Sequence, residues 1–199
     1  MLRFYGSPMS SSGRTHWMLE ECDVEYESIV TNPRDGGTRA EAFLQLNPLG
    51  TVPFIIDGEI RLAESIAINM YLAERYKPAL LGATVAERAL IWQWSLWGIT
   101  NLQPPTLQVL AHRHMLPEGQ RRPEIADEAA ARAESLLAKL EGCLRGEFLV
   151  GQRFTAADIN CGSVVNLAAR VGLGADKPRV VAWLERLRER PAYQVAAKG

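Results

Sequence analysis

The chain has 199 residues, of which 47% are hydrophobic, so it can bury the core of one large domain or of two small ones. Its 22 basic and 23 acidic residues leave a formal net charge of -1, which excludes a global field that would gather nucleic acid or an anionic membrane surface. Three distant cysteines without a Cys-x-x-Cys pair or a Cys/His cluster argue against a zinc site. With no basic leader and no apolar run of about 18 residues, we expect a cytoplasmic protein with reduced, packed thiols, no metal, and neither nucleic acid nor membrane as a partner.

The first 77 residues alternate strand and helix patterns. An apolar run over 2–5 stops at a Gly-Ser-Pro turn and predicts a strand, and apolar residues at helical spacing from about Ser12 predict a helix. The patterns that follow predict, in chain order, a strand over 24–30, a short helix around 40–46, strands over 52–56 and 59–62, and a helix over 63–76. The two apolar runs on either side of Asp57-Gly58 are typical of a tight hairpin. This part of the chain is therefore predicted to fold as βαβαββα.

The second half lacks strand patterns and is predicted to be all-helical. A change of composition over 77–83 marks the boundary, and the helices expected after it cover 84–114, 124–144, 155–171 and 179–188. Thr155 and Asp158 precede an apolar run at the spacing of a capping box, which we interpret as structural rather than catalytic. The predicted fold class is α/β plus all-α, with domains over 1–77 and 84–199.

Three motifs lie in the predicted α/β half. They are GSPMSSSGR over 6–14, NPLGTVP over 47–53 and LAESIAI over 62–68. With these motifs and this order of elements, the chain resembles the cytosolic glutathione transferase family, in its serine-type, bacterial-like classes, across nearly its whole length. The resemblance implies a thioredoxin-like, glutathione-binding N-terminal domain, a helical domain that carries an electrophile pocket, glutathione as co-substrate, and a homodimer.

The second and third motifs are expected to bind glutathione. The resemblance implies a cis bond before Pro53, which would turn the Val52 backbone toward a peptide ligand; the alternative is an ordinary trans proline at the start of a strand. Glu64 and Ser65 stand at a helix entrance, where a hydroxyl and free N–H groups form an anion site. In the family this position holds the γ-glutamyl end of glutathione. The alternative is a plain N-cap pair.

The sequence departs from the family pattern at Thr51, where many members carry Lys, Arg or Gln. One ligand contact is expected to be weaker as a result. Arg39, with Gln45 as the second choice, is expected to meet the glycyl carboxylate of glutathione, since a guanidinium binds a carboxylate in a bidentate manner. Arg14 is expected to be structural or to lie at the subunit interface.

The serine-rich loop before the first helix is the predicted catalytic segment. A hydroxyl that donates to sulfur stabilises a thiolate over a thiol, and a helix N-terminus favours the same anion. Ser10 stands four residues before Arg14, an offset that resembles the catalytic serine of the family, and it is our first choice. Ser11 and Ser12 are rivals that would otherwise cap the helix, and Tyr5 is a weaker rival that would otherwise pack in the sheet. No cysteine stands here, which argues against classes that work through a mixed disulfide.

The helix expected over 84–114 is predicted to wall the electrophile pocket. Its candidate residues, at helical spacing, are Trp94, Trp97, Asn101, Pro104, Pro105, Gln108 and His112. Core or dimer contacts are the alternative for each of them, and for His112 and His114 a solvated helix end is expected rather than acid-base chemistry. Trp92, Trp94 and Trp97 together exceed what one small helical chain is expected to bury, which supports the homodimer.

Other functions fit the same motifs. A protein of this fold can hold glutathione or an apolar ligand without turnover, or serve as a docking scaffold, because a fold does not fix a function. Within the enzymes, a glutathione-dependent isomerase or dehalogenase is a further alternative. Two assays separate these functions from a glutathione transferase that acts on a small apolar electrophile. They are retention on immobilised glutathione and turnover of a panel of electrophiles with and without glutathione.

Overall fold

The computed structural model describes residues 1–8 and 10–198, so Met9 of the first motif and Gly199 lie outside the described residues. The chain divides into two compact units. One comprises Met1–Leu81 with Arg190–Gly199, and the other comprises Gly82–Glu189. Each unit has its own core and is described by itself.

The first unit is built on a mixed four-stranded sheet. Its strands are β1 Leu2–Gly6, β2 Tyr26–Val30, β3 Phe54–Asp57 and β4 Ile60–Ala63, in the order β2-β1-β3-β4. β1 runs parallel to β2 and antiparallel to β3, and β3 runs antiparallel to β4. Together with helices α1 Ser12–Cys22, α2 Glu41–Leu46 and α3 Ser65–Tyr76, this confirms the predicted βαβαββα order and the thioredoxin-like fold class.

The hairpin differs from the predicted one by a residue. Asp57 pairs with Ile60, so the turn consists of Gly58 and Glu59 rather than Asp57 and Gly58. Gly58 has φ 61°, a conformation that glycine adopts without steric cost. Asp57 stays in the strand because its carboxylate accepts hydrogen bonds from two tyrosine hydroxyls of α3, at 2.8 and 2.6 Å.

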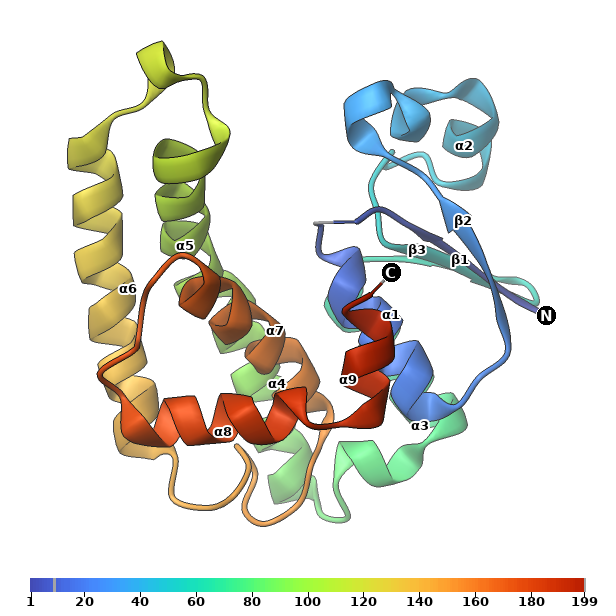
Figure 1. The fold of residues 1–199 in the computed structure, drawn as a ribbon. Helices are drawn as coiled ribbons and strands as arrows, with labels where there is room; N and C mark the ends of the chain where they lie inside the picture. The colour runs from blue at the N-terminus through green and yellow to red at the C-terminus, as the bar shows by residue number, and fades with distance from the viewer. Residues whose placement is uncertain (9, 199) are drawn as a thin grey trace. The chain divides into compact units, whose positions relative to one another are not determined.

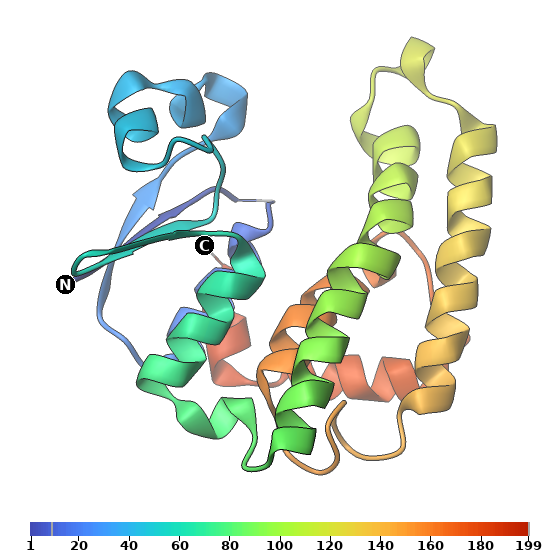
Figure 2. The same cartoon turned by 180° about the vertical axis from the view of Figure 1, so that it is seen from behind.

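Alternation along the strands gives the sheet two apolar faces. Tyr5, Phe54 and Ile56 pack with Phe43 of α2 on one face. Phe4, the neighbour of Tyr5, points the other way and its ring lies 6.1 Å from that of His16 in α1. Consistent with this period of two, α1 and α3 cover one face of the sheet and α2 covers the other (Figures 1 and 2).

The last helix, α9 Pro191–Ala196, packs on α1 and belongs to the first unit, although the sequence predicted one helical domain over 84–199. Arg190 binds the buried Glu21 of α1 in a bidentate manner, at 2.5 and 2.8 Å. The ring of Tyr193 meets that of Trp17 edge-on at 5.0 Å. A charged and an aromatic contact therefore attach this short helix to α1.

The second unit is a helical bundle whose main helices are α4 Val85–Trp97, α5 Gln103–Leu110, α6 Pro123–Cys143, α7 Ala156–Arg170 and α8 Pro178–Arg188. α5 lies alongside α6, and α4 packs on α7 (Figures 1 and 2). The helix predicted over 84–114 is interrupted by π-helical turns at Gly98–Leu102 and Ala111–Met115. Pro104 and Pro105 have no N–H to donate to the preceding turn, which accounts for the first interruption.

Candidate functional site

The three sequence motifs meet at one end of the sheet. In the antiparallel pairs, Phe54 at the start of β3 lies opposite Tyr5, near the end of β1, and opposite Ala63, at the end of β4. The segments that leave the sheet here are therefore 6–14, 47–53 and 64–65 of the first unit. Because α1 and α3 follow these strands, both helices begin at this end and direct the positive ends of their dipoles toward it.

The three serines at the entrance of α1 have different hydrogen bonds. The Ser10 hydroxyl lies 2.7 Å from the Ser7 carbonyl and 2.8 Å from Ser12 Oγ, and it accepts from the Ser12 N–H at 3.1 Å. Ser12 is buried, and its Oγ accepts from the Ser7 N–H at 3.2 Å. Ser11 is the N-cap residue without a side-chain cap bond, so the expected capping role of its hydroxyl is not what the structure shows. Its Oγ instead makes a long, 3.5 Å contact with the Val52 carbonyl.

The segment before β3 presents backbone groups at the same place. The Val52-Pro53 peptide is cis, as the resemblance implied. The Val52 N–H has no hydrogen-bond partner within residues 1–8 and 10–198. Thr51 is exposed, and its carbonyl accepts from the side chain of buried Asn47 at 2.8 Å. Asn47 thus positions this turn, a role that the Asn-Pro signal in the motif indicates but that we did not assign to it.

Glu64 and Ser65 form an open entrance to α3. Glu64 is a non-glycine residue at φ 70°, and its exposed side chain makes no cap bond. Ser65 is the first residue of the helix, and its hydroxyl has no partner in the described part of the chain. The positive φ of Glu64 serves no hydrogen bond that caps the helix. A strained residue beside free helix N–H groups is typical of a binding site.

Arg39 reaches the same turn from the other side. Its Nη1 lies 3.1 Å from where a β-carbon at position 50 would stand, next to Thr51 and Val52. Gly50 has φ 60° and is closely surrounded, so the turn requires a glycine. Arg39 is exposed and its guanidinium makes no hydrogen bond or ion pair in the described chain, whereas the side-chain amide of Gln45 donates to the Glu41 carboxylate at 3.5 Å. The guanidinium is therefore available to an anionic ligand.

Tyr5 is packed in the sheet. It is 6% exposed, and its ring lies 5.6 Å from those of both Phe43 and Phe54. This is the position that the sequence offered as its alternative to catalysis. The backbone of Arg14, in contrast, contributes to the frame of the site, since its carbonyl accepts from the buried Asn69 side chain of α3 at 3.2 Å.

The predicted pocket residues belong to the second unit. Asn101, Pro104 and Gln108 are exposed, and Trp97 and His112 are half-buried. Trp97 packs edge-on against Trp94, with ring centroids 5.4 Å apart. His112 accepts the N–H of Arg122 through Nδ1 at 3.2 Å, which joins the end of the α5 stretch to the start of α6. This contact agrees with a helix-end role for His112.

Comparisons with known proteins agree with this architecture. The sequence matches the family models "Glutathione S-transferase, N-terminal domain" over residues 1–74 and "Glutathione S-transferase, C-terminal domain" over residues 102–191. It is 32% identical to glutathione S-transferase 3 of Zea mays, over 97% of this chain and 91% of the relative. It is 28% identical to glutathione S-transferase F9 of Arabidopsis thaliana, over 98% and 95%.

Among solved structures, the fold is similar to that of the theta class glutathione S-transferase from Xanthomonas axonopodis pv. citri, which was crystallised with glutathione bound. The TM-score is 0.91 at 33% identity, and the match covers 100% of this chain and 97% of the other. Both halves of the sequence, the full-length relatives and the structural match point in the same direction. The chain belongs to the glutathione S-transferase family.

Proposed function

We propose that this glutathione transferase binds glutathione at the end of the sheet where the three motifs meet, and ionises its thiol there for attack on a small apolar electrophile. The observation that carries the proposal is the set of unused groups at this end. The N-terminus of α3, the Val52 N–H and the Ser65 hydroxyl are donors without partners in the described chain, and the N-terminus of α1 points to the same end of the sheet. Such donors suit a ligand that carries carboxylates and a thiolate.

Each part of glutathione has a complementary group in this arrangement. The γ-glutamyl carboxylate is assigned to Ser65 and the N-terminus of α3, and its amino group to the Glu64 carboxylate. The cysteinyl backbone pairs with Val52 next to Pro53, as an added strand would. The glycyl carboxylate is assigned to Arg39, whose guanidinium lies next to the turn at Gly50 and Thr51. Arg39 would thus replace the Lys, Arg or Gln that many family members carry at position 51.

Thiol activation has a limited energetic value. A thiol with a pKa of about 8.5 is already a few per cent ionised at pH 7, so complete ionisation gains only about thirtyfold, or roughly 2 kcal/mol. Holding the electrophile beside the sulfur can contribute about 7 to 11 kcal/mol at its upper limit. We assign this second task to residues of the α4–α5 stretch, namely Trp97, Asn101, Pro104, Gln108 and His112.

Ser10 is proposed as the activating residue, with Ser11, Ser12 and Tyr5 as its rivals. A hydroxyl has one proton, and that of Ser10 is now directed to the Ser7 carbonyl or to Ser12 Oγ. When glutathione binds, the Ser10 hydroxyl must rotate so that its proton is donated to the sulfur, while the Ser12 N–H continues to donate to Ser10 Oγ.

The test is an ultraviolet titration of the bound thiolate in the Ser10→Ala variant. One hydrogen bond to a charged group is worth about 1.5 to 3 kcal/mol, so the pKa of the bound thiol is expected to rise by about one to two units. Turnover at neutral pH is expected to fall by about tenfold, up to the limit of about thirtyfold that ionisation can supply, and to recover as the pH rises. An unchanged pKa in this variant, with a raised pKa in Ser11→Ala, Ser12→Ala or Tyr5→Phe, would transfer the role to that residue.

The same preparation separates transferase activity from the alternatives. Retention on immobilised glutathione with turnover of an electrophile panel supports the transferase. Retention without turnover indicates a binding protein, and no retention indicates a scaffold. Turnover that leaves glutathione unconsumed indicates an isomerase, and net halide release without a stable conjugate indicates a dehalogenase.

We further propose that the protein is a homodimer. The apolar side chains of Val85, Trp92 and Leu96 lie at helical spacing along α4 and are 75%, 45% and 45% exposed. Two-fold pairing is the commonest way in which such a stripe is covered. Sedimentation at micromolar concentration should show a species of twice the mass of the chain, and a monomer alone would contradict the proposal.

A cytosolic location is proposed from the state of the thiols. Cys22 and Cys161 are buried and Cys143 is exposed, and none of the three forms a disulfide in the described chain. Burial raises the pKa of the Cys22 thiol to about 11, so this group stays protonated and unreactive at neutral pH. Within residues 1–8 and 10–198, no helix has the length and hydropathy to cross a membrane.

A further inference from the structure

The second unit carries a hollow that the transferase reaction does not use. Its volume is about 370 Å³, and its lining residues are Leu144, Arg145, Gly146, Arg179, Ala182, Trp183 and Arg186. The first three follow the end of α6, and the other four belong to α8. All of them lie in the second unit, whereas the residues assigned to glutathione lie in the first.

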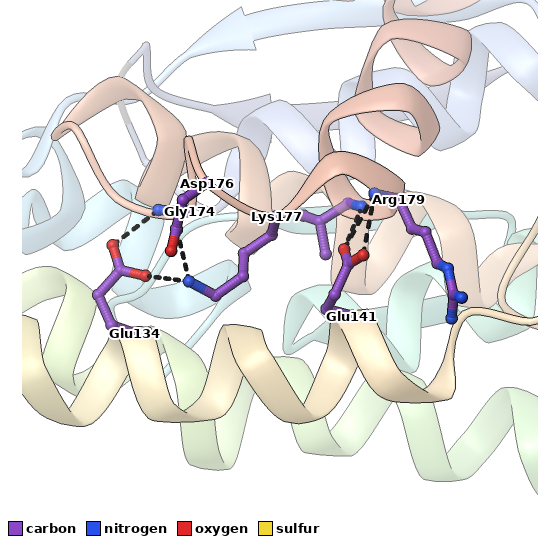
Figure 3. A network of polar contacts seen from close by, with 7 residues as sticks. Glu134, Glu141, Gly174, Asp176, Lys177 and Arg179 are labelled. Carbon is purple, nitrogen blue, oxygen red and sulfur yellow. Dashed lines mark hydrogen bonds and ion pairs between the residues drawn. The ribbon is translucent and has the colours of Figure 1, made fainter.

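Helix geometry brings the arginines to one side. Arg179 and Arg186 are seven residues apart, which places them on the same face of α8 two turns from each other. The start of α8 is fixed beside α6, because the Glu141 carboxylate accepts the backbone N–H groups of Arg179 and Val180, each at 3.0 Å. Figure 3 shows these bonds, with the Arg179 side chain running past the Glu141 carboxylate rather than onto it. Arg145 then faces this side of α8 from the segment after α6.

A second contact between α6 and the loop before α8 supports this placement. Two turns before Glu141 on α6, the Glu134 carboxylate accepts hydrogen bonds from the Gly174 N–H at 2.8 Å and from the Lys177 ammonium at 3.3 Å (Figure 3). Glu134 and Glu141 therefore hold both ends of the 174–180 segment. The rim of the hollow is built on backbone that is anchored twice.

The arginines around the hollow form no ion pair within the described chain. In the part of the chain that the structure describes, the guanidinium groups of Arg145 and Arg179 make no ion pair or hydrogen bond. Arg186 donates to the Glu147 carbonyl at 2.8 Å and lies 5.8 Å from the centre of the Phe148 ring, neither of which carries a negative charge at the contact. Three guanidinium groups together with the Glu141 carboxylate at the start of α8 leave a local net charge of +2.

We propose that this hollow binds a small organic anion that carries two or more carboxylate or phosphate groups. Guanidinium groups bind such groups in a bidentate manner, and a bound anion would relieve the mutual repulsion of the three arginines. The volume lies within the range of small-molecule sites, and Leu144, Ala182 and Trp183 give the ligand an apolar wall. The site makes the helical unit a ligand-binding unit in its own right.

The test is a calorimetric titration with citrate, at low ionic strength, of the full chain saturated with S-hexylglutathione to occupy the glutathione site. We expect one citrate per chain and a dissociation constant that rises about fivefold or more in Arg145→Gln and in Arg179→Gln. Arg132→Gln, which removes the same charge from an exposed position on α6, is the matched control and is expected to change the constant less than twofold. Inorganic sulfate, with a single anionic centre, is expected to bind at least tenfold more weakly than citrate.

Two results would overturn the proposal. One is the lack of saturable binding up to about 10 mM citrate. The other is equal weakening by Arg132→Gln and the two pocket variants, which would indicate diffuse attraction to a basic surface. Arg145 and Arg179 are both exposed, so thermal unfolding of the two variants is expected to match that of the parent chain, and either variant alone suffices for the comparison.

Discussion

Two helix entrances in this protein use similar residues in opposite ways. At α7, the Asp158 carboxylate is fully buried and accepts four hydrogen bonds, from the Leu149 N–H, the Thr155 N–H and hydroxyl, and the Trp183 indole, at 2.9 to 3.0 Å. At α3, Glu64 is exposed and strained, and the Ser65 hydroxyl has no partner in the described chain.

The two entrances differ in whether the chain itself supplies the hydrogen-bond partners of the hydroxyl and the carboxylate. Both sites pair a hydroxyl with a carboxylate at the start of a helix that follows a turn or strand. At α7 the chain supplies every partner, and the result is a closed structural joint. At α3 the Glu64 carboxylate and the Ser65 hydroxyl have no partner in the described chain, and the backbone of Glu64 is strained. Both features are expected where a ligand completes the site. The same residue types therefore stabilise the entrance of α7, and at α3 they form part of the glutathione site that we propose.

The largest effect is predicted for Asp158→Ala. The substitution leaves four donors, three of them buried, without their acceptor, so the free energy of unfolding is expected to fall by about 3 to 5 kcal/mol. Burial raises the pKa of Asp158, and the four donors oppose that shift. Urea denaturation measures the loss. Asp127→Ala, at an exposed ion pair with Arg113, is the control and is expected to cost no more than about 1 kcal/mol; a similar value for Asp158→Ala would contradict the closed joint.

A smaller effect of opposite sign is predicted for Glu64→Gly. Glycine relieves the strain at φ 70°, so the free energy of unfolding is expected to rise by about 0.5 to 1 kcal/mol, while affinity for glutathione falls about tenfold with the loss of the carboxylate. Glu64→Ala removes the same carboxylate but keeps the strain, and it is expected to lose affinity without gaining stability. Equal stabilities for the two variants would show that the conformation carries no cost.

The smallest effect on stability is predicted for His16, which lies one turn into α1 from Ser12. Burial lowers the pKa of His16, although Glu20 at 3.6 Å acts against it. The unfolded chain thus takes up a proton near pH 6.5, whereas the folded chain resists it, so this contribution to stability is present above pH 6.5 and is lost as the pH falls. His16→Gln should flatten the fall in stability between about pH 7.5 and 5.5, as measured by urea denaturation at a series of pH values, and an unchanged slope in this variant would contradict the effect of burial.

Much of the fold was predictable because local patterns decide it. The hairpin around Gly58 and the capping box at Thr155 follow from turn chemistry and helix-capping patterns, and a period of two predicts the strand over 24–30, of which the structure forms Tyr26–Val30. α9 was not predictable in this way. It has six residues, and what fixes it is Glu21 and Trp17 on α1, about 170 residues earlier in the chain.

For the candidate site, the sequence names a set of residues but does not define their geometry. The motifs name Val52, Glu64 and Ser65, but only the strand order β2-β1-β3-β4 brings them to one end of the sheet. The positive φ of Glu64 runs against the steric preference of a non-glycine residue, so no propensity indicates it. The hydrogen bonds that occupy Ser10 depend on the path of the loop, which the sequence pattern does not specify.

One paired measurement tests the contrast between the two entrances directly, because Ser65→Ala and Thr155→Val each remove a single hydroxyl. Glutathione affinity by calorimetry and the free energy of unfolding by urea are measured for both variants. Ser65→Ala is expected to raise the dissociation constant about tenfold or more and to change stability by less than about 0.5 kcal/mol. Thr155→Val is expected to cost about 1 to 2 kcal/mol of stability and to leave the dissociation constant within twofold. A Ser65→Ala variant that loses stability as Thr155→Val does, yet binds glutathione as tightly as the parent chain, would contradict the assignment of the α3 entrance to the ligand.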